Sequence, residues 1–537
     1  MLDNQGLDVQ QLIDIYSISA TNESGIYLGK GDRGYLFAPK ECGVLVLGPP
    51  RSGKTTSVII PNVLTANSAV IVTSTKHDVV DQTYLFRSRI APCYIFDPTQ
   101  SASFSEEITS IGWSPLDNAN QFDRALLTAK SMVLAARPDS NRGEAQHWTQ
   151  KATELLATLL HAASLSKTPF SEALSWLNRH DGSLALRILD SSAKDSEVAF
   201  DVLSGILNTD FREQSGIWST ASSVCACYQN SRAIANTELP RVDYKSLLEE
   251  KSTVYVVASG ENQQLLAPVI AGFIGDMKRA AYAINVTPNI TDKKEYTGHP
   301  AKLLLILDEL ANIAPLHDLP EIIAEGGSQG VTTLACLQDL SQARRRWPVV
   351  ADGFFSLFHT KFILPGLGDR QTLENISLLC GEKDEIVFSK TSHHKKSDKK
   401  LDSKTASIRK VKKMPVDIIS RGEEGKALLI MGSAVGGVNL TPSYNLRNVI
   451  SKEFSLSKND NFGLLVKKDL SSKSSDFNFK SQSFRTTKQQ NTAYKRISPS
   501  DDLEFEQLTF WDSNKIKHAP RKSTIFHRDR PGGSRSL

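Results

Sequence analysis

The sequence predicts an α/β fold in which a parallel, doubly wound sheet carries a phosphate-binding loop, an all-α domain is inserted, and the C-terminal tail is disordered. Three observations predict this fold. An apolar strand pattern at 44–47 runs straight into G-x-x-x-x-G-K-T and then into an apolar stretch suited to a helix. Strand and helix patterns alternate on both sides of a long helical stretch. The last part of the chain is polar, with only isolated aromatic residues.

The phosphate-binding loop is the most specific motif of the chain. Its residues are Gly48, Pro49, Pro50, Arg51, Ser52, Gly53, Lys54, Thr55 and Thr56. Glycines let the backbone curl so that successive N–H groups point at a polyphosphate, and the helix that follows directs its N-terminal dipole at the same anion. Lys54 is expected to contact the β- and γ-phosphates, and Thr55 to offer its hydroxyl to Mg²⁺. Such a loop alone does not separate a kinase, a GTPase and a motor.

A pair of acids far downstream supplies the second half of the site. Lys302 is followed by the continuous apolar run Leu303 to Leu307, a strand pattern that ends in Asp308 and Glu309. A strand buried on both faces of a parallel sheet delivers such residues to its C-terminal edge. Asp308 is expected to hold the Mg²⁺ shell and Glu309 to polarise an attacking water, which favours hydrolysis over transfer. A strand followed by a surface acidic turn is the alternative.

Gln338 is the third candidate catalytic residue, with Lys54 and Glu309. It ends the apolar run 331–337, the next strand pattern after the acidic one. At that position a polar side chain can lie beside the γ-phosphate and respond to hydrolysis. A glutamine that faces solvent at the end of a strand is the alternative.

The remaining elements follow in chain order. Strand patterns occur at 69–76, 92–98, 252–258 and 426–432, and residues 25–29 form a short strand or turn. Between about 120 and 236, apolar residues instead recur every three or four positions. We therefore expect four regions: a first part of the nucleotide-binding domain (1–119), an all-α inserted domain (120–236), a second part of the nucleotide-binding domain (237–446) and a disordered basic tail (447–537).

Two polar segments are predicted not to pack against the hydrophobic core. Residues 390–413 hold ten Lys or Arg against two Asp and almost no large apolar residue, which predicts a solvated loop that could touch phosphate backbones or acidic lipid. The tail is rich in Ser, Lys, Asn and Gln. Within it, 501–511 is acidic and aromatic, a pattern that fits a short element folding on a partner as well as it fits random tail sequence.

Composition places the chain among globular proteins made and kept in the cytoplasm. Of 537 residues, 40% are hydrophobic and 23% charged, and the net charge of +4 is too small to argue for nucleic acid by itself. No run approaches twenty apolar residues, and the first residues are polar and acidic, so neither a membrane span nor a signal peptide is predicted. The six cysteines lack paired zinc-ligand spacing and are expected to be buried thiols.

Taken together, these blocks resemble the type IV coupling proteins, the TraG/TraD-like ATPases of conjugation and type IV secretion. The resemblance spans roughly residues 25–445. Its residues are Gly48 to Thr56 with Ile60-Pro61-Asn62, Ser74-Thr75-Lys76, Phe96-Asp97-Pro98, Leu307 to Asn312, Leu337 to Gln342, and Gly366 to Asp369 with Ser377.

The resemblance implies a RecA-like P-loop NTPase domain, ATP and Mg²⁺ as ligands, and a homohexameric ring with active sites between subunits. It also implies ATP hydrolysis that moves a relaxase–DNA complex or a protein substrate to a secretion channel.

Two features of the sequence depart from the family pattern. The family usually begins with membrane-spanning helices, which this sequence lacks, so a membrane partner would have to recruit it. Relatives often place an arginine just before the sensor strand, where it acts on the neighbouring subunit, but the stretch 325–330 has none. This trans-acting role could pass to Arg344, Arg345, Arg346 or Arg370, or be weak, and a solvated helix face is the alternative for Arg344 to Arg346.

Three functions remain open at this point. The leading one is an ATPase that couples a conjugative substrate to a type IV secretion channel. The second is a DNA translocase that works without a channel. The third is a nucleotide-gated adaptor that recruits relaxase and hydrolyses little ATP. DNA, single- or double-stranded, would be contacted mainly through its phosphates, because no base-reading pattern is present.

Overall fold

The structure is a computed structural model of the whole chain. It describes residues 9–21, 25–32, 34–100, 108–137, 144–192, 196–258, 260–286, 302–351, 353–393 and 401–443. The predicted tail, 447–537, and its acidic segment 501–511 lie outside the described residues. No helix in the described ranges is long and apolar enough to cross a lipid bilayer.

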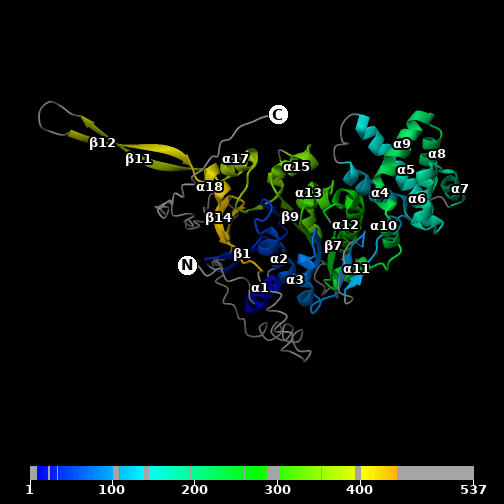
Figure 1. The fold of residues 1–537 in the computed structure, drawn as a ribbon, viewed down its shortest axis with the longest axis horizontal. Helices are drawn as coiled ribbons and strands as arrows, with labels where there is room; N and C mark the ends of the chain where they lie inside the picture. The colour runs from blue at the N-terminus through cyan, green and yellow to red at the C-terminus, as the bar shows by residue number, and fades with distance from the viewer. Residues whose placement is uncertain are drawn as a thin grey trace, which may run out of the picture. The chain divides into compact units, whose positions relative to one another are not determined.

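One twelve-stranded sheet organises the described chain (Figure 1). Its strand order is β2-β1-β14-β13-β10-β3-β9-β8-β4-β7-β5-β6, and neighbours from β10 to β6 run parallel. The parallel strands are β3 (Val44–Leu47), β4 (Ala69–Ser74), β5 (Cys93–Phe96), β6 (Thr109–Ser110), β7 (Thr253–Val257), β8 (Leu303–Leu307), β9 (Val331–Leu337) and β10 (Thr360–Ile363). The parallel sheet predicted from the strand patterns is confirmed.

The other end of the sheet is antiparallel. It is formed by β1 (Tyr27–Gly31), β2 (Gly34–Phe37), β13 (Lys426–Met431) and β14 (Ala434–Asn439). The sequence analysis found β1 and β13 but missed β2, β10 and β14. β2 and β10 have only four residues each, and β14 carries two glycines, so their patterns are weak without the neighbours that they pair with.

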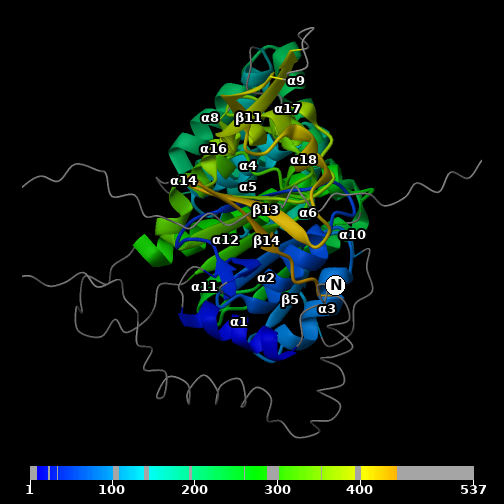
Figure 2. The same cartoon turned by 90° about the vertical axis from the view of Figure 1, so that its left-hand side faces the viewer.

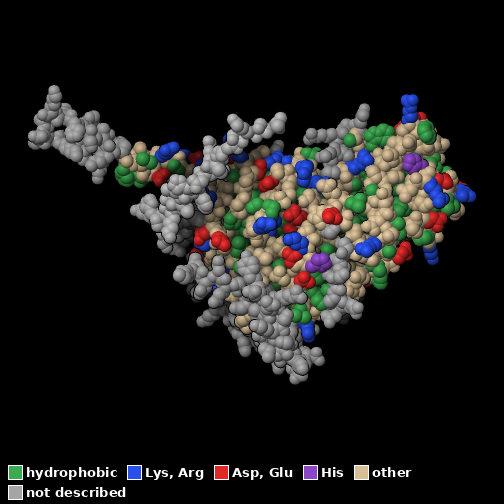
Figure 3. Space-filling model, in the orientation of Figure 1, with side chains coloured by type: hydrophobic (Ala, Val, Ile, Leu, Met, Phe, Trp, Pro, Cys, Tyr) green, Lys and Arg blue, Asp and Glu red, His purple; other side chains and the backbone are tan. Residues whose placement is uncertain are grey.

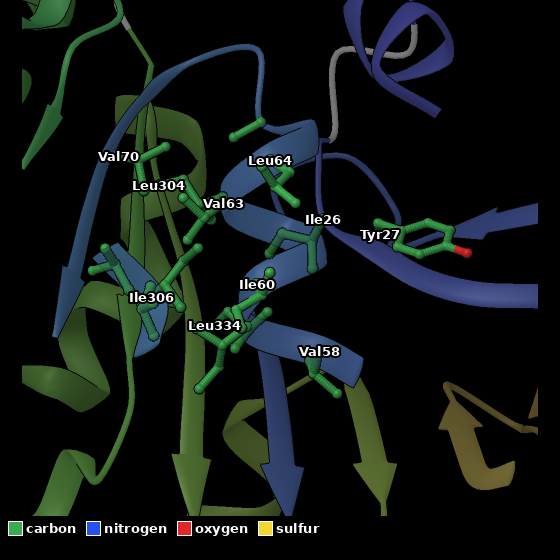
Figure 4. Packing of buried hydrophobic residues seen from close by; sticks show 14 of the residues in the cluster. Ile26, Tyr27, Val58, Ile60, Val63, Leu64, Val70, Leu304, Ile306 and Leu334 are labelled. Carbon is green, nitrogen blue, oxygen red and sulfur yellow. The ribbon is translucent and has the colours of Figure 1, made fainter. Parts of the chain in front are cut away.

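Helices cover both faces of the sheet. One face carries α1 (Val9–Thr21), the loop helix with α2 (Ile60–Thr65), and α3 (Asp78–Arg87) (Figure 2). These helices share one hydrophobic cluster with the strands. Figure 4 shows Val58, Ile60, Val63 and Leu64 of the loop helix packed against Leu304, Ile306 and Leu334 of the sheet. On the other face, Phe273 of α12 (Gln263–Val286) stacks on Phe96, with ring centroids 4.5 Å apart.

The stretch between β6 and β7 is helical throughout its described part. It contains α4 (Phe122–Ala136), α5 (Glu144–Leu165), α6 (Phe170–Arg179), α7 (Ser183–Ser191), α8 (Glu197–Leu207), α9 (Phe211–Val224), α10 (Ser231–Asn236) and α11 (Tyr244–Glu249). Trp113 next to it donates from Nε1 to Asp276 Oδ2 of α12 at 2.8 Å. The division of the chain at 119, 236 and 446 stays a prediction.

The prediction of a solvated loop at 390–413 was wrong over most of its length. β11 (Glu382–His393) and β12 (Leu401–Lys412) form a separate two-stranded antiparallel sheet, paired from Glu382↔Lys412 to His393↔Leu401. Composition missed it because the two strands alternate a few β-branched and aromatic residues with many charged ones. We call this pair of strands the ribbon.

The six cysteines are unpaired, and all except Cys42, which is partly exposed, are buried. Burial raises the pKa of the Cys93 thiol to about 11, and that of Cys380 likewise to about 11. The expectation of buried thiols is confirmed for five of the six.

Candidate nucleotide-binding site

The predicted phosphate-binding loop connects β3 to the helix that begins at Thr55. The backbone N–H of Gly48 donates to Leu337 O at 3.1 Å, which ties the start of the loop to β9. Arg51 and Gly53 then adopt left-handed conformations, with φ values of 65° and 88°. Ser57 N–H closes the turn onto Gly53 O at 2.8 Å. The loop therefore curls back on itself just before its helix, as an anion-binding loop must.

Gly48 has no room for a side chain. A Cβ built there would lie 2.6 Å from Ser52 Oγ and 3.0 Å from two atoms of Leu364, which follows β10. Ser52 Oγ is buried and, within the described part of the chain, has no hydrogen-bond partner. An inward-facing polar atom without a partner beside a tightly curled backbone fits a loop that closes around a phosphate.

Lys54 lies over this loop. Its side chain is buried, and Nζ donates to Pro49 O at 3.0 Å and also to Gly48 O. These carbonyls hold the ammonium group directly above the loop backbone. An anion placed in the loop would meet this positive charge.

Thr55 and Thr56 open the loop helix. The first turn is a π-helical segment from Thr55 to Ile59, and α2 continues from Ile60 with Pro61 in its first turn. Thr56 Oγ1 donates to Gly53 O at 3.4 Å. Thr55, the predicted Mg²⁺ ligand, is partly exposed at the mouth of the loop.

Asn62 fixes the loop helix to the antiparallel part of the sheet. Its Nδ2 donates to Tyr27 O at 2.9 Å and to Val58 O at 2.8 Å, and its Oδ1 accepts from Tyr27 N at 2.8 Å. The side chain is completely buried. Sequence reasoning included Asn62 in a motif but gave it no role. A lone amide within an apolar helix pattern was the signal that could have found this anchor.

Asp308 and Glu309 lie where the sequence predicted, directly after β8. Thr73 Oγ1 of the adjacent β4 donates to Asp308 O at 2.9 Å, and Glu309 N–H donates to Asp308 Oδ1 at 3.1 Å. Burial raises the pKa of the Asp308 carboxyl to about 6, and the neighbouring Glu309 adds to the effect, while Lys54 opposes it. The opposing effect of Lys54 indicates that the two halves of the predicted site lie close enough to interact.

Asp78 is a further acid of this region that sequence reasoning missed. It is the first residue of α3, and its charge also raises the pKa of Asp308. It follows the Ser74-Thr75-Lys76 block, in which Ser74 Oγ accepts from Lys76 N at 3.2 Å. No local pattern sets Asp78 apart from other acids at the starts of helices, so only the fold places it here.

Glu309 has a strained backbone and a held side chain. Its φ and ψ are 49° and 42°, the left-handed region that non-glycine residues seldom adopt. Asn312 Nδ2 donates to Glu309 Oε2 at 3.3 Å, and Asn312 N to Glu309 O at 2.8 Å. Strain of this kind concentrates at functional positions, where the surrounding structure holds it.

Gln338 follows β9, and β9 lies between the loop strand and the acidic strand. The register places Leu47 of β3 beside Leu337, and Leu307 of β8 beside Ala335. Gln338 is therefore the first residue past β9, between the Gly48 edge and the Asp308 edge of the sheet. Gln342 Oε1 accepts from Gln338 N at 2.9 Å and fixes this turn.

The profile of one protein family matches nearly the whole described chain. This family is described as type IV secretory system conjugative DNA transfer, and the match covers residues 2–416. The chain belongs to this family. The motif residues at the sheet edge, from Gly48 to Gln338, all lie within the matched range.

Two curated relatives are similar to this chain. The conjugal transfer proteins TraG from Escherichia coli are 23% identical over 357 residues and 22% identical over 352 residues. The first match covers 61% of this chain and 54% of the relative, and the second 60% and 53%. The chain thus spans about half the length of these relatives.

Solved structures of a coupling protein have the same fold. The unbound bacterial conjugative coupling protein TrwBdeltaN70 matches with a TM-score of 0.55 at 17% identity, over 81% of this chain and 91% of that one. TrwB in complex with ADP and Mg²⁺ matches with a TM-score of 0.53 at 18% identity, over 75% and 85%. TrwB with the ATP analogue ADPNP gives 0.53 at 17% identity over the same shares. This chain therefore has the RecA-like P-loop fold.

The arginines that the sequence offered as a trans-acting residue differ in their surroundings. Arg344 pairs with Asp369 at 2.9 Å, and Arg346 Nε donates to Ala311 O at 2.6 Å, so both are held within their own chain. Arg345 is exposed on the same short helix, α15 (Leu340–Arg346). Arg370 is exposed at the start of α17 (Arg370–Leu379) and pairs with Glu374, one turn away, at 2.7 Å.

Proposed function

We propose that this family member is an ATPase coupling protein that recruits a relaxase–DNA complex, or a protein substrate, and drives its transfer through a type IV secretion channel. The single observation that carries the proposal is the strand order β3-β9-β8. It brings the phosphate loop, Gln338 and the Asp308–Glu309 pair to one edge of the sheet. A site that hydrolyses ATP and signals the hydrolysis needs these three parts together.

The residues present fit ATP and Mg²⁺. The tight curl at Gly48, the inward-facing Ser52 hydroxyl and the Lys54 ammonium suit a polyphosphate. Thr55 and Asp308 would hold the Mg²⁺ ion, and TrwB has been observed with ADPNP and with ADP and Mg²⁺. When bound, the metal would neutralise charge on the phosphates.

Three residues of the chain would have separate roles in ATP hydrolysis. Glu309, whose carboxylate is oriented by Asn312, would hold and polarise the attacking water. Lys54 would bind the β- and γ-phosphates. Gln338, attached to the turn before α15, would respond to the loss of the γ-phosphate and pass the change to that helix.

The partners follow from the family and remain proposals for this chain. Single- or double-stranded DNA would be bound through its phosphates, and relaxase would bring the DNA. A homohexamer would place Arg345 or Arg370 of one subunit near the nucleotide of the next. The all-α domain at 120–236 would be the inserted domain of each subunit, and a membrane partner would recruit the cytoplasmic ring to the inner face of the cell membrane.

Steady-state ATP hydrolysis tests the proposal. Wild type, Glu309→Gln and the matched control Glu325→Gln, an exposed acid of α14 (Leu319–Glu325), are compared with and without single-stranded DNA. We expect DNA-stimulated turnover in the wild type and the control, and its loss in Glu309→Gln. Oligomer mass is followed in the same samples.

The alternatives give different results. Tight ATP binding without turnover under all conditions would overturn the motor and leave a nucleotide-gated adaptor. Turnover that depends on DNA, but conjugation that proceeds without the protein in a deletion strain, would leave a DNA translocase that works without a channel.

A further inference from the structure

The ribbon exposes an apolar face that nothing in the described chain covers. In an antiparallel pair, residues directly opposite each other share a face, and the register pairs Ile386 with Ile408 and Phe388 with Ala406. Ile386, Phe388 and Ile408 are 59%, 71% and 72% exposed. Figure 3 shows hydrophobic side chains gathered on the described part of the ribbon. We call these three residues the ribbon cluster.

A ribbon of this kind needs a partner. Two strands alone are marginally stable in water, and three large apolar side chains on one face add an exposed patch that costs free energy until it is covered. Exposed apolar patches with charged residues around them mark sites of protein association. The ribbon cluster has such a border, because the neighbouring pairs towards the base are Asp384 with Lys410 and Glu382 with Lys412.

The same chain also has an apolar pocket with no described occupant. Its volume is about 200 Å³, and its lining includes Leu134 of α4, Pro315, Pro320, Trp347, Pro348 and Val349. Val349 is 71% exposed, and the lining also includes Glu321, Arg346 and His317. Concave apolar sites lined by aromatic and proline side chains accept bulky apolar residues of a partner.

Charge indicates which partner suits the ribbon. Residues 382–413 carry eleven Lys or Arg and five Asp or Glu, whereas residues 1–381 and 414–446 together carry 34 Lys or Arg and 44 Asp or Glu. A basic ribbon and an acidic remainder of the same protein attract each other between copies.

We propose that the ribbon of one copy of this chain docks on a second copy, with the ribbon cluster in the pocket around Trp347 and Val349. The contact joins two different surfaces, so it is head-to-tail, and repetition of such a contact closes a ring if the rotation allows. This inference rests on the proposed homo-oligomer, and it identifies the two surfaces that would hold the copies together.

The pocket is attached to the nucleotide site of the copy that carries it. Trp347 Nε1 donates to Leu316 O at 2.8 Å, and Arg346 Nε donates to Ala311 O at 2.6 Å. Ala311 lies two residues after Glu309, in α13 (Leu310–Ile313). A neighbour's ribbon in the pocket therefore presses on the segment that holds the catalytic carboxylate, which links assembly to turnover.

Assembly of the full chain gives the first test. Sedimentation over a concentration series, with ATP analogue and single-stranded DNA present, compares wild type with Phe388→Ser/Ile408→Ser and with Val349→Asp. The control is Phe211→Ser, which removes an 81% exposed aromatic residue from α9. Each lost apolar contact weakens association about tenfold, so we expect the double variant to weaken assembly roughly 100-fold and the control to leave it unchanged. Unchanged assembly of the double variant would overturn the proposal.

Cross-linking gives the second test. In a Cys42→Ser background, a chain with Phe388→Cys is mixed with a chain with Val349→Cys, and a short bismaleimide reagent is added. The five other cysteines are buried, so the reagent should join the two introduced thiols. We expect a heterodimer with Val349→Cys and none with Phe211→Cys. An assembled sample without this cross-link would refute the contact.

ATP hydrolysis in the same samples separates this inference from the proposed activity. A wild type that stays monomeric at every concentration while hydrolysing ATP would overturn the ribbon contact alone. Assembly with the expected cross-link but no hydrolysis would support the contact and count against the ATPase. Loss of DNA binding with unchanged assembly in Phe388→Ser/Ile408→Ser would assign the ribbon to nucleic acid and overturn its role between copies.

Discussion

Asn312 holds the carboxylate of Glu309, with Nδ2 donating to Oε2 at 3.3 Å. Glu309 immediately precedes α13 and Asn312 lies three residues later within it, and the backbone N–H of Asn312 also donates to Glu309 O. A side chain that orients a catalytic base contributes to turnover without contacting the nucleotide.

Replacement of Asn312 by Ala should therefore lower kcat for ATP roughly 10-fold and leave nucleotide affinity nearly unchanged, because the base loses its orientation and the loop does not. Steady-state kinetics with a fluorescent-nucleotide titration measures both. Asn178→Ala, at an exposed position of α6, serves as the control. An Asn312→Ala enzyme with wild-type kcat would mean that this hydrogen bond does not orient Glu309.

In the nucleotide-free protein, the buried carboxylate of Asp308 should lower the free energy of unfolding. Its pKa of about 6 lies above the ordinary carboxyl value of 3.8, so the folded protein releases the proton later than the unfolded chain, and stability falls as pH rises through this interval. Asp308→Asn removes the buried charge and should raise the free energy of unfolding by roughly 2–3 kcal/mol at pH 8. The gain at pH 5 should be about half as large.

Denaturant unfolding at the two pH values tests this, and the stabilisation that Mg²⁺–ATP adds should disappear in the same variant. Equal effects of Asp308→Asn at pH 5 and pH 8 would contradict the raised pKa. A variant that kept its Mg²⁺-dependent stabilisation would contradict the role of Asp308 as a metal ligand.

Asn62 lies outside the phosphate-binding loop but should contribute substantially to the free energy of unfolding. Asn62→Leu removes three buried hydrogen bonds and leaves the N–H and C=O of Tyr27 without these partners. We expect a loss of about 2–4 kcal/mol in the free energy of unfolding. Urea unfolding measures it, with exposed Asn178→Leu as the control, and a loss below about 1 kcal/mol would show that β1 is held to the loop helix by other contacts.

Replacement by alanine should change the free energy of unfolding in opposite directions at two helical glycines. A Cβ at Gly272 of α12 would lie 2.3 Å from the Trp113 ring, whereas at Gly205 of α8 nothing lies within 4 Å. Gly272→Ala should destabilise by about 1–3 kcal/mol, and Gly205→Ala should stabilise by about 0.5–1 kcal/mol because alanine favours the helix. Thermal unfolding of both variants gives the comparison. Stabilisation by Gly272→Ala would show that α12 is free to move away from Trp113.

The nucleotide motifs were readable from sequence because their chemistry is local. The loop from Gly48 to Thr56 needs its glycines, lysine and threonine at fixed spacing, and Asp308 follows an uninterrupted apolar strand. Such strands are buried on both faces, so the pattern reveals them without knowledge of their neighbours. The same reasoning placed Gln338 at the end of a strand.

Other features appeared only when distant segments met. Sequence reasoning missed β10 and β14 and read most of the ribbon as a loop, because short or highly charged strands are defined by the strands that they pair with. Arg87 is completely buried, and its guanidinium donates to Thr253 Oγ1 and to carbonyls of the segments before β4 and β7. Nothing in its own helix distinguishes it from a surface arginine.

The sequence by itself predicted the chemistry of the proposed nucleotide site and determined the kind of element that carries each of its residues, since both depend on residue type and spacing over a few positions. Only the tertiary structure decided that β9 lies between β3 and β8, that Asn62 ties the loop helix to β1, and that Asn312 holds Glu309. Strand order, register and burial depend on contacts between residues far apart in the chain, and one sequence alone does not encode them in any local pattern.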